Sequence, residues 1–384
     1  RVGAGLGGRA RDSDCDAGLL GWRVLTASTI SVARSTQVGV VFDRHIHQQE
    51  NAMETLPITC RFANPWIEDN SVFVKTLGEI GSTVTSARTA LRERMEDSIL
   101  KAEPAEHHEL AAVDSSNITV EIADFSTVLA QAAIHYRGET TFGQTMRFGP
   151  MDSESARSFY ISARIAAECE LLAGATTPVI ADNSLWSFLM EANQAITSWG
   201  NSEKRDDLTS VINLIESLFL PMLQNKNLLA MPKSGTSSSI SNHPDYKDLF
   251  TTRVSDKFVL SQVLEPGEYT RPKLLGVLGH FGIERRAEWD VDAINAMYTR
   301  ELYYTYYKPW PYKSCYRIEG RKCALSDATF ASVKEATRHR TIAEPLPQFM
   351  VDVAVKQLVG ISELYGDSNS HRIPFTGFNR TFRR

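Results

Sequence analysis

The sequence predicts an α/β fold, in which a mixed sheet is flanked by helices and preceded by an N-terminal helical arm. One observation behind this is a series of short apolar runs, rich in β-branched residues and separated by polar breaks, that begins at Glu109. The other is that segments between these runs have apolar residues every three or four positions, which is the spacing of a helix face. Strands that alternate with helices favour a sheet with helices packed on it.

The N-terminal part of the chain has the weakest patterns. Residues 1–52 mix Gly, Arg and Ser with isolated apolar residues and are expected to be a poorly ordered N-terminal extension. Residues 53–108 are expected to form the helical arm and linker. Within them, apolar residues four apart predict an amphipathic helix at 85–101.

From Glu109 the expected order is β-β-β-α-β-α-β. The first helix ends at Gly174 and the second near Pro221, because glycine and proline are typical of helix ends. A late helix is expected at 347–366. In order, the seven elements lie at 110–117, 118–125, 128–136, 152–174, 177–185, 208–221 and 228–233.

Two further segments have a distinctive composition. The Ser-rich stretch 234–242 is expected to be a mobile loop. The aromatic run at 302–312 is interpreted as a half-buried strand, an environment that suits Tyr and Trp. The alternative is that its rings stack on the bases of a nucleic acid.

Composition excludes several classes of protein. With 384 residues, 23% of them charged, and a net charge of −5, the chain is expected to be globular and not to coat nucleic acid by bulk charge. No apolar run is long enough to cross a bilayer. The five cysteines include no CxxC pair, which argues against a disulfide framework or a zinc cluster. A reducing, cytoplasmic location is therefore expected.

Three carboxylates lie where their position is informative. Asp114 and Asp182 each follow an apolar strand and precede Ser or Asn, and Glu168 lies on the apolar face of the helix between them. An Asx turn explains each aspartate alone. A buried ion pair with Arg164 and a functional role explain Glu168 equally well.

Together, the order Asp on a strand, Glu on a helix and Asp on the next strand is the layout with which RNase H-like folds gather carboxylates around divalent metals. Mg²⁺ and Mn²⁺ are hard cations that prefer oxygen ligands. Two such ions can activate a water and stabilise the leaving oxygen of a phosphodiester. The sequence therefore predicts a metal site built from Asp114, Glu168 and Asp182.

The motifs around these residues resemble the NurA family, which are DNA-end-processing nucleases. Two Asp-Gly-Ser-like signatures and an Arg-x-x-x-Glu helix of that family are similar to three segments here, and weaker motifs follow in the same order across residues 109–366. The segments are AVDSSN at 112–117, ARIAAECELL at 163–172, IADNSL at 180–185, MPKS at 231–234, SDKFVLSQVLEPGEYTRP at 255–272, YRIEG at 316–320 and EPLPQFMVDVAV at 344–355.

The resemblance implies an RNase H-like nuclease domain over residues 109–384. It leaves open whether Glu168 or Glu170 is the helix ligand. The residues it implies to be functional are Asp114, Glu168, Asp182 and Asp352 as catalytic residues, the first three of them as metal ligands, and Lys233 and Arg317 as DNA contacts.

The resemblance also implies an activity and partners. The chain would be a Mn²⁺-dependent deoxyribonuclease, with Mg²⁺ as the alternative ion, that acts as a 5′-to-3′ exonuclease and single-strand endonuclease on DNA ends in double-strand-break repair. It would form a homodimer and work with a hexameric ATPase of the HerA type.

Two departures from the family support a different function. Ser115 and Asn183 stand where the family has glycine, which allows a positive φ. The alternative is therefore a catalytically weakened scaffold that binds DNA or the translocase without cutting. An RNase H-like enzyme that acts on RNA or on a recombination intermediate is a third hypothesis.

Overall fold

The structure is a computed structural model, and it describes residues 70–122, 125–143, 146–151, 153–201, 206–233, 237–250, 253–276 and 289–356. The chain divides into two units, Arg1–Asn70 and Ser71–Arg384, and all described residues except Asn70 belong to the second. The expected extension 1–52 lies outside the described residues. In the described part of the chain, no helix is long and apolar enough to cross a membrane.

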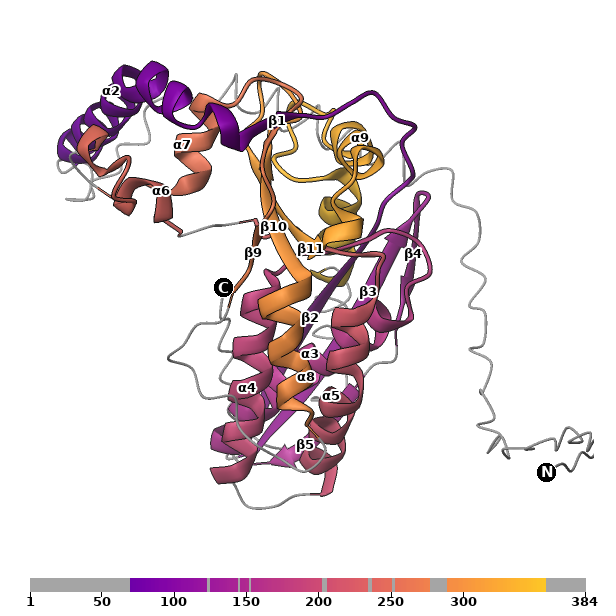
Figure 1. Ribbon diagram of the computed structural model, residues 1–384. Helices are drawn as coiled ribbons and strands as arrows, with labels where there is room; N and C mark the ends of the chain where they lie inside the picture. Colours follow the sequence, from indigo (N-terminus) through magenta and orange to yellow (C-terminus); the bar gives the residue numbers. More distant parts are fainter. Residues whose placement is uncertain are drawn as a thin grey trace, which may run out of the picture. The chain divides into compact units, whose positions relative to one another are not determined.

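The described strands form one mixed sheet of eleven strands (Figure 1). The pairs β2–β6 and β6–β7 are parallel, and the other pairs are antiparallel. In spatial order the strands are β1 (Ile99–Lys101), β8 (Glu268–Thr270), β10 (Leu302–Tyr307), β11 (Tyr316–Arg321), β7 (Leu228–Ala230), β6 (Val179–Ala181), β2 (Ala111–Ile122), β3 (Phe125–Tyr136) and β4 (Glu139–Phe142), with β5 (Met146–Met151) paired to β3 and β9 (Lys273–Leu274) paired to β10.

Helices flank this sheet, as the sequence predicts. They are α2 (Asn70–Arg94), α3 (Ser153–Gly174), α4 (Leu185–Asn201), α5 (Asp206–Gln224), α6 (Ser239–Asn242), α7 (Asp256–Val263), α8 (Val291–Ala296), α9 (Asp327–Ala336) and a helix at 346–356. Single turns lie at Glu96–Ser98, Lys247–Leu249, Met297–Glu301 and Lys322–Ala324.

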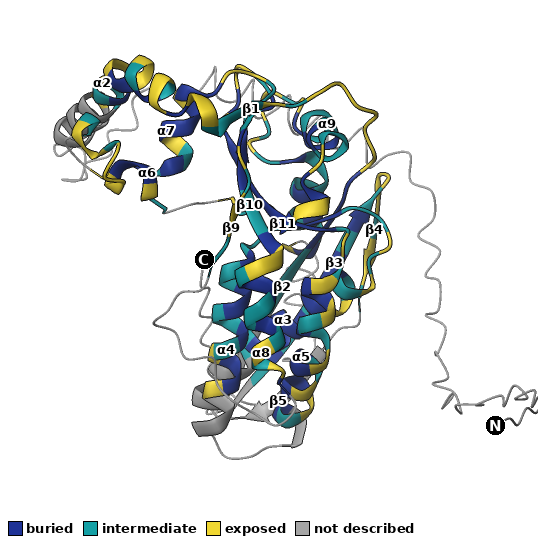
Figure 2. Cartoon of the chain, in the orientation of Figure 1, coloured by how far each residue is buried: buried dark blue, intermediate teal, exposed yellow. Residues whose placement is uncertain are grey.

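Alternate residues of the central strands enter different hydrophobic cores. Ala111 and Val113 pack with buried residues of α3, α4, α5 and α8. Leu110 and Ala112 pack with buried residues of α9 and of helix 346–356. This alternation is the period of two of a strand, and the buried residues gather between the layers (Figure 2). The two faces of the sheet are therefore covered by different helices.

The two strands expected at 110–117 and 118–125 are wrong, because one strand, β2, spans most of both. The polar residues after Asp114 do not end the strand, since they continue the antiparallel ladder with β3 without a break. Asp114 consequently lies inside a strand of 12 residues and not at its end. The short strands β4 and β5, which the patterns did not predict, extend the sheet beyond β3.

The segment 177–185 also differs from the expectation. The strand is short and ends at Ala181, and the unpredicted helix α4 begins at Leu185. The hydroxyl of Ser184 accepts a hydrogen bond of 2.9 Å from the Ser187 amide, which satisfies a free amide at the start of the helix.

Helix α3 is confirmed, but other helix boundaries are wrong. α5 continues through Pro221, since Met222 and Leu223 beyond it are fully buried in the core. The helix expected at 85–101 is α2, which begins earlier and ends at Arg94. The late helix is described as far as residue 356, and the rest of the prediction lies outside the described residues.

The loop expected at 234–242 is ordered in its described part. The buried Asp256 carboxylate accepts hydrogen bonds of 2.6 Å from the Ser237 and Ser239 hydroxyls and one of 2.8 Å from the Ile240 amide. These bonds hold the short helix α6 against α7. The strand expected in the aromatic run is confirmed as β10.

Candidate metal centre

Asp114 and Asp182 are brought together by the register of two parallel strands. Ala112 of β2 pairs with Ile180 of β6 and Val113 with Ala181, and the residue that follows in the chain is an aspartate in both cases. Ala112 and Ile180 belong to the core that contains helix 346–356. Since side chains alternate along a strand, both aspartates lie toward that same face.

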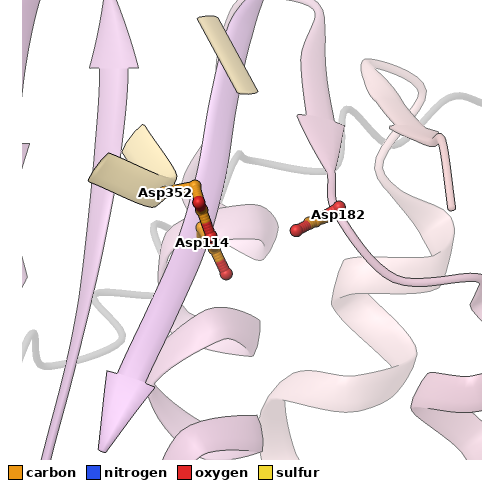
Figure 3. A group of neighbouring side chains, drawn as sticks. All are labelled: Asp114, Asp182 and Asp352. Carbon is orange, nitrogen blue, oxygen red and sulfur yellow. The ribbon is translucent and has the colours of Figure 1, made fainter. Parts of the chain in front are cut away.

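Asp352, on helix 346–356, completes the group. Oxygen atoms of Asp114, Asp182 and Asp352 all lie within 4.8 Å of one another, and this is the group of possible metal ligands found among the described residues. Figure 3 shows Asp352 beside Asp114, with Asp182 directed toward both. All three are half-buried. The structure thus joins residues that are 238 positions apart in the sequence, from 114 to 352.

Lys233 lies among these carboxylates. Its Nζ is 2.7 Å from an Asp182 oxygen, 3.0 Å from Glu344 and 3.4 Å from Asp352. Asp352 also accepts a hydrogen bond of 2.7 Å from Lys356. Two lysines therefore oppose four carboxylates, and the site keeps an excess of negative charge that favours a bound cation.

Two residues of this site were missed by the sequence analysis. Glu344 contacts Lys233, and the Gln348 side-chain amide donates hydrogen bonds to Asp182 and to the Met231 carbonyl. The signal was present, because Glu344, Gln348 and Asp352 are spaced four apart, as residues on one helix face are.

The crowding of carboxylates changes their protonation. Burial, together with the charges of Glu168 and Asp182, raises the pKa of Asp114 to about 8. Burial also acts to raise the pKa of Asp352, but Lys356 and Lys233 outweigh it and hold that pKa below its usual range. At neutral pH Asp114 is thus the carboxyl that keeps a proton, until a cation replaces it.

Glu168 lies on the other side of β2. Its side chain is 5% exposed, accepts a hydrogen bond from the Ser115 hydroxyl and is 3.5 Å from Arg164. Burial raises the pKa of Glu168, against the effects of Arg164 and Ser115. The structure thus confirms the ion pair of Glu168 with Arg164, and a functional role for Glu168 stays a prediction. Glu170 is exposed.

Arg164 links Glu168 to the second signature. Its guanidinium also pairs with Glu191 of α4, and the other Glu191 oxygen accepts a hydrogen bond of 3.3 Å from the Asn183 side chain. Ser115 and Asn183 are therefore the two ends of one network. Among the described residues, Arg137 is the one non-glycine residue with a positive φ. The backbone of Ser115 is therefore not strained by the absence of a glycine at this position.

Arg317 has protein partners. Its Nε is 2.6 Å from a Glu319 oxygen, and its guanidinium lies 4.5 Å from the centre of the Tyr304 ring. The other oxygen of the fully buried Glu319 accepts a hydrogen bond of 2.7 Å from the Leu185 amide. Arg317 thus supports the start of α4, and its expected contact with DNA stays a prediction.

The donor set fits a hard divalent cation. Three carboxylates supply oxygen ligands, and the Gln348 carbonyl oxygen, which is buried and has no hydrogen-bond partner, lies on the side chain that binds Asp182. Oxygen donors of this kind suit Mg²⁺ or Mn²⁺, and the group contains no thiolate or imidazole that would favour zinc.

Comparison with known proteins places the fold. No protein-family model matches the chain, and no curated protein sequence matches it. The NurA nuclease from Sulfolobus solfataricus is similar in structure, with a TM-score of 0.50 and 12% identity over 82% of this chain and 100% of that one. A structure of NurA bound to dAMP and manganese has a TM-score of 0.47 and 10% identity over 76% of this chain and 93% of that one.

The similarity confirms the fold that the motif order implied. A mixed sheet flanked by helices is common to the prediction and the structure, although Asp114 lies inside β2 and only Asp182 follows the end of its strand. The chain has a NurA-like variant of the RNase H-like α/β fold.

Proposed function

We propose that this chain is a divalent-metal-dependent DNA nuclease. The observation that supports this best is the convergence of Asp114, Asp182 and Asp352 on one face of the central strands, in a chain whose fold resembles that of a nuclease. The coarser part of the proposal is phosphodiester hydrolysis. The finer parts are DNA as substrate, Mn²⁺ as the preferred ion and 5′-to-3′ polarity.

A bound divalent ion would supply positive charge to the scissile phosphate and acidify a water. The carboxylates of Asp114, Asp182 and Asp352 would hold it, and Asp114 would lose its proton on binding. Lys233 would then exchange some of its carboxylate contacts for a phosphate oxygen, since its side chain is 36% exposed. Glu168 lies on the opposite face of β2 and would influence the site through Ser115, whose hydroxyl donates a hydrogen bond to it.

The direct test uses the purified full chain, Mn²⁺ and single-stranded DNA labelled at its 5′ end. Asp182→Asn and Asp352→Asn should abolish degradation. Glu170→Gln, an exposed neighbour of Glu168 on the same helix, serves as the matched control and should cut normally. Degradation that persists in both aspartate variants would overturn the proposal, whereas Glu168→Gln shows whether that residue is needed.

The scaffold function has one supporting observation. The Lys233 ammonium already lies within 3.4 Å of three carboxylates, and in this way it partly neutralises the site without a metal. Calorimetric titration with Mn²⁺ separates the two functions. Tight binding that disappears in Asp182→Asn supports the nuclease, and an absence of binding supports the scaffold.

The partners and setting are proposals that rest on the family resemblance. We expect a homodimer, an association with a HerA-type hexameric ATPase, and a role in processing DNA ends in the cytoplasm. Light scattering of the purified chain tests the dimer. Co-purification with the ATPase, at the salt concentration of the nuclease assay, tests the association.

A further inference from the structure

The aromatic run at 302–312 divides into two parts of different character. Residues 302–307 form β10 within the sheet, but the turn that follows presents Trp310 and Tyr312 at the surface. Their rings are nearly parallel, with 14° between the planes and 5.9 Å between the centres. Tyr312 is 41% exposed, so its ring is open to solvent.

Hydrogen bonds fix the edges of both rings. The Trp310 indole donates a hydrogen bond of 2.9 Å to the Lys334 carbonyl, and the Tyr312 hydroxyl donates one of 2.8 Å to the Arg338 carbonyl. The polar atoms of the two rings are thereby held by the backbone. A ring fixed in this way loses little freedom when another flat group stacks on it.

Cations surround the pair. The Lys334 ammonium lies 4.9 Å from the centre of the Trp310 ring, and the Arg340 guanidinium lies 5.1 Å from that of Tyr312. Arg338 is close by and pairs with Glu335, at 2.6 Å. A cavity of about 310 Å³ adjoins them, with Trp310, Lys334 and Glu335 in its wall. We define Trp310, Tyr312, Lys334 and Arg340 as the aromatic–basic surface.

The register of the sheet places the end of β10, which leads into this surface, level with Lys233 of the metal centre. Tyr307, the last residue of β10, pairs with Tyr316 on β11. Because Glu319 pairs with Ala230 in the antiparallel pair β11–β7, Tyr316 lies level with the position three residues after Ala230, which is Lys233. Neighbouring strands are about 4.8 Å apart, so β10 lies about 15 Å from β6.

One chain segment connects the two places. Residues 338–344 begin at the Tyr312 hydroxyl, pass the side chains of Lys313 and Tyr316, which donate to carbonyls of this segment, and end at Glu344 beside Lys233. From residue 340 to 344 an extended chain spans at most about 14 Å. A strand of a few nucleotides covers such a distance.

We propose that the aromatic–basic surface binds the single strand of DNA that leads to the metal centre. Bases stack on Trp310 and Tyr312, and Lys334 and Arg340 contact the phosphates. This combination of flat rings and cations binds a single strand with little preference for sequence, because every base has a π-face. In a duplex the stacking of neighbouring base pairs hides those faces, so the surface selects unpaired DNA. The proposal rests on DNA being the substrate.

The experiment measures binding without cleavage. Fluorescence anisotropy of a labelled 20-nucleotide oligo(dT) is followed with the full chain in EDTA, where no divalent ion is present. Tyr312→Ala should weaken binding about tenfold, in the range found for one stacked base. Arg340→Ala should reduce the dependence of the affinity on salt. Phe142→Ala removes another exposed aromatic side chain, 38% exposed on β4, and should bind like the parent.

The outcomes separate this inference from the proposed nuclease function. Binding of oligo(dT) that stays within twofold of the parent in Tyr312→Ala, or that is absent in the parent, overturns the inference even if the chain cuts DNA. A blunt duplex that binds as tightly and is weakened equally by Tyr312→Ala overturns the selectivity for single strands. A chain that does not cut but loses oligo(dT) binding in Tyr312→Ala supports the inference while the nuclease function fails.

Discussion

Two acidic groups lie on opposite faces of the central strands, and they differ in how their charge is balanced. On one face, Asp114, Asp182 and Asp352 share a site with Lys233. On the other face, Glu168 and Glu191 share one arginine and are also bound by Ser115 and Asn183. Asp114 and Asp182 thus belong to one group, and the residue that follows each of them, Ser115 or Asn183, binds a glutamate of the other group.

The difference shows which group attracts a cation. A buried carboxylate is costly unless it is paired, and Arg164, whose side chain is only 24% exposed, pairs with both glutamates. In the aspartate group Lys233 and Lys356 contact Asp182 and Asp352, and Asp114 instead keeps a proton up to a pKa of about 8. Substitutions in the two groups should therefore have opposite effects on stability.

The largest effect should come from Arg164→Met. It leaves the buried Glu168 and the half-buried Glu191 without their counter-charge, and the free energy of unfolding should fall by about 3 kcal/mol or more. Urea unfolding of the metal-free chain measures this. The control, Arg88→Met, removes an exposed pair with Glu265 and should change stability by less than about 1 kcal/mol. Equal losses in both variants would contradict the difference between the groups.

Asp114→Asn should act in the opposite direction. It removes the carboxyl whose ionisation the site disfavours, so the metal-free chain should be as stable as the parent or more stable. Cleavage in Mn²⁺ should fall by more than about 100-fold, because loss of a ligand exceeds the effect of losing an outer partner. Thermal unfolding in EDTA and a nuclease assay give both values. A destabilised, active variant would show that Asp114 is only structural.

Metal affinity should depend on pH through Asp114. The folded pKa of about 8 lies above the ordinary value of about 3.9. Below pH 8 a cation must displace the proton, so Mn²⁺ affinity should rise up to about tenfold per pH unit as the pH increases toward 8.

The same proton affects stability with the opposite sign. Between pH 4 and 8 the folded, metal-free chain binds a proton that the unfolded chain releases, so this contribution to the free energy of unfolding falls as the pH rises.

Calorimetry in buffers of different ionisation enthalpy tests the pH dependence of metal binding, because it counts the protons that are released when Mn²⁺ binds. An affinity that is constant from pH 5 to 8 would exclude Asp114 as a ligand.

The smallest effect is expected from Ser115→Ala. It removes the hydroxyl that donates to Glu168, at a cost of about 1 kcal/mol in stability. If Glu168 contributes to metal binding, Mn²⁺ affinity should also fall, by about tenfold. Ser217→Ala, on the surface of α5, is the control. An unchanged affinity in Ser115→Ala would assign Glu168 to the fold alone.

Local patterns sufficed for much of the fold. Apolar runs with strand character located β2, β3, β6 and β7, and the helical period located α3 and α5. These local patterns failed to predict the bounds of elements that depend on contacts with residues far away in the sequence. The polar residues from Ser115 to Asn117 continue β2 because β3 lies beside them, and Pro221 remains in a helix because the residues after it are buried.

The sequence alone determined that Asp114 and Asp182 follow apolar runs of similar design and that Glu168 lies on a buried helix face. Those statements depend on residues near in the chain. The tertiary structure brings Asp352, which the family resemblance had implied as a site residue, beside the two aspartates and places Glu168 on the opposite face of β2. The physical reason is that β2 sends alternate side chains to opposite faces, and the helix at 346–356 packs on the face of the aspartates.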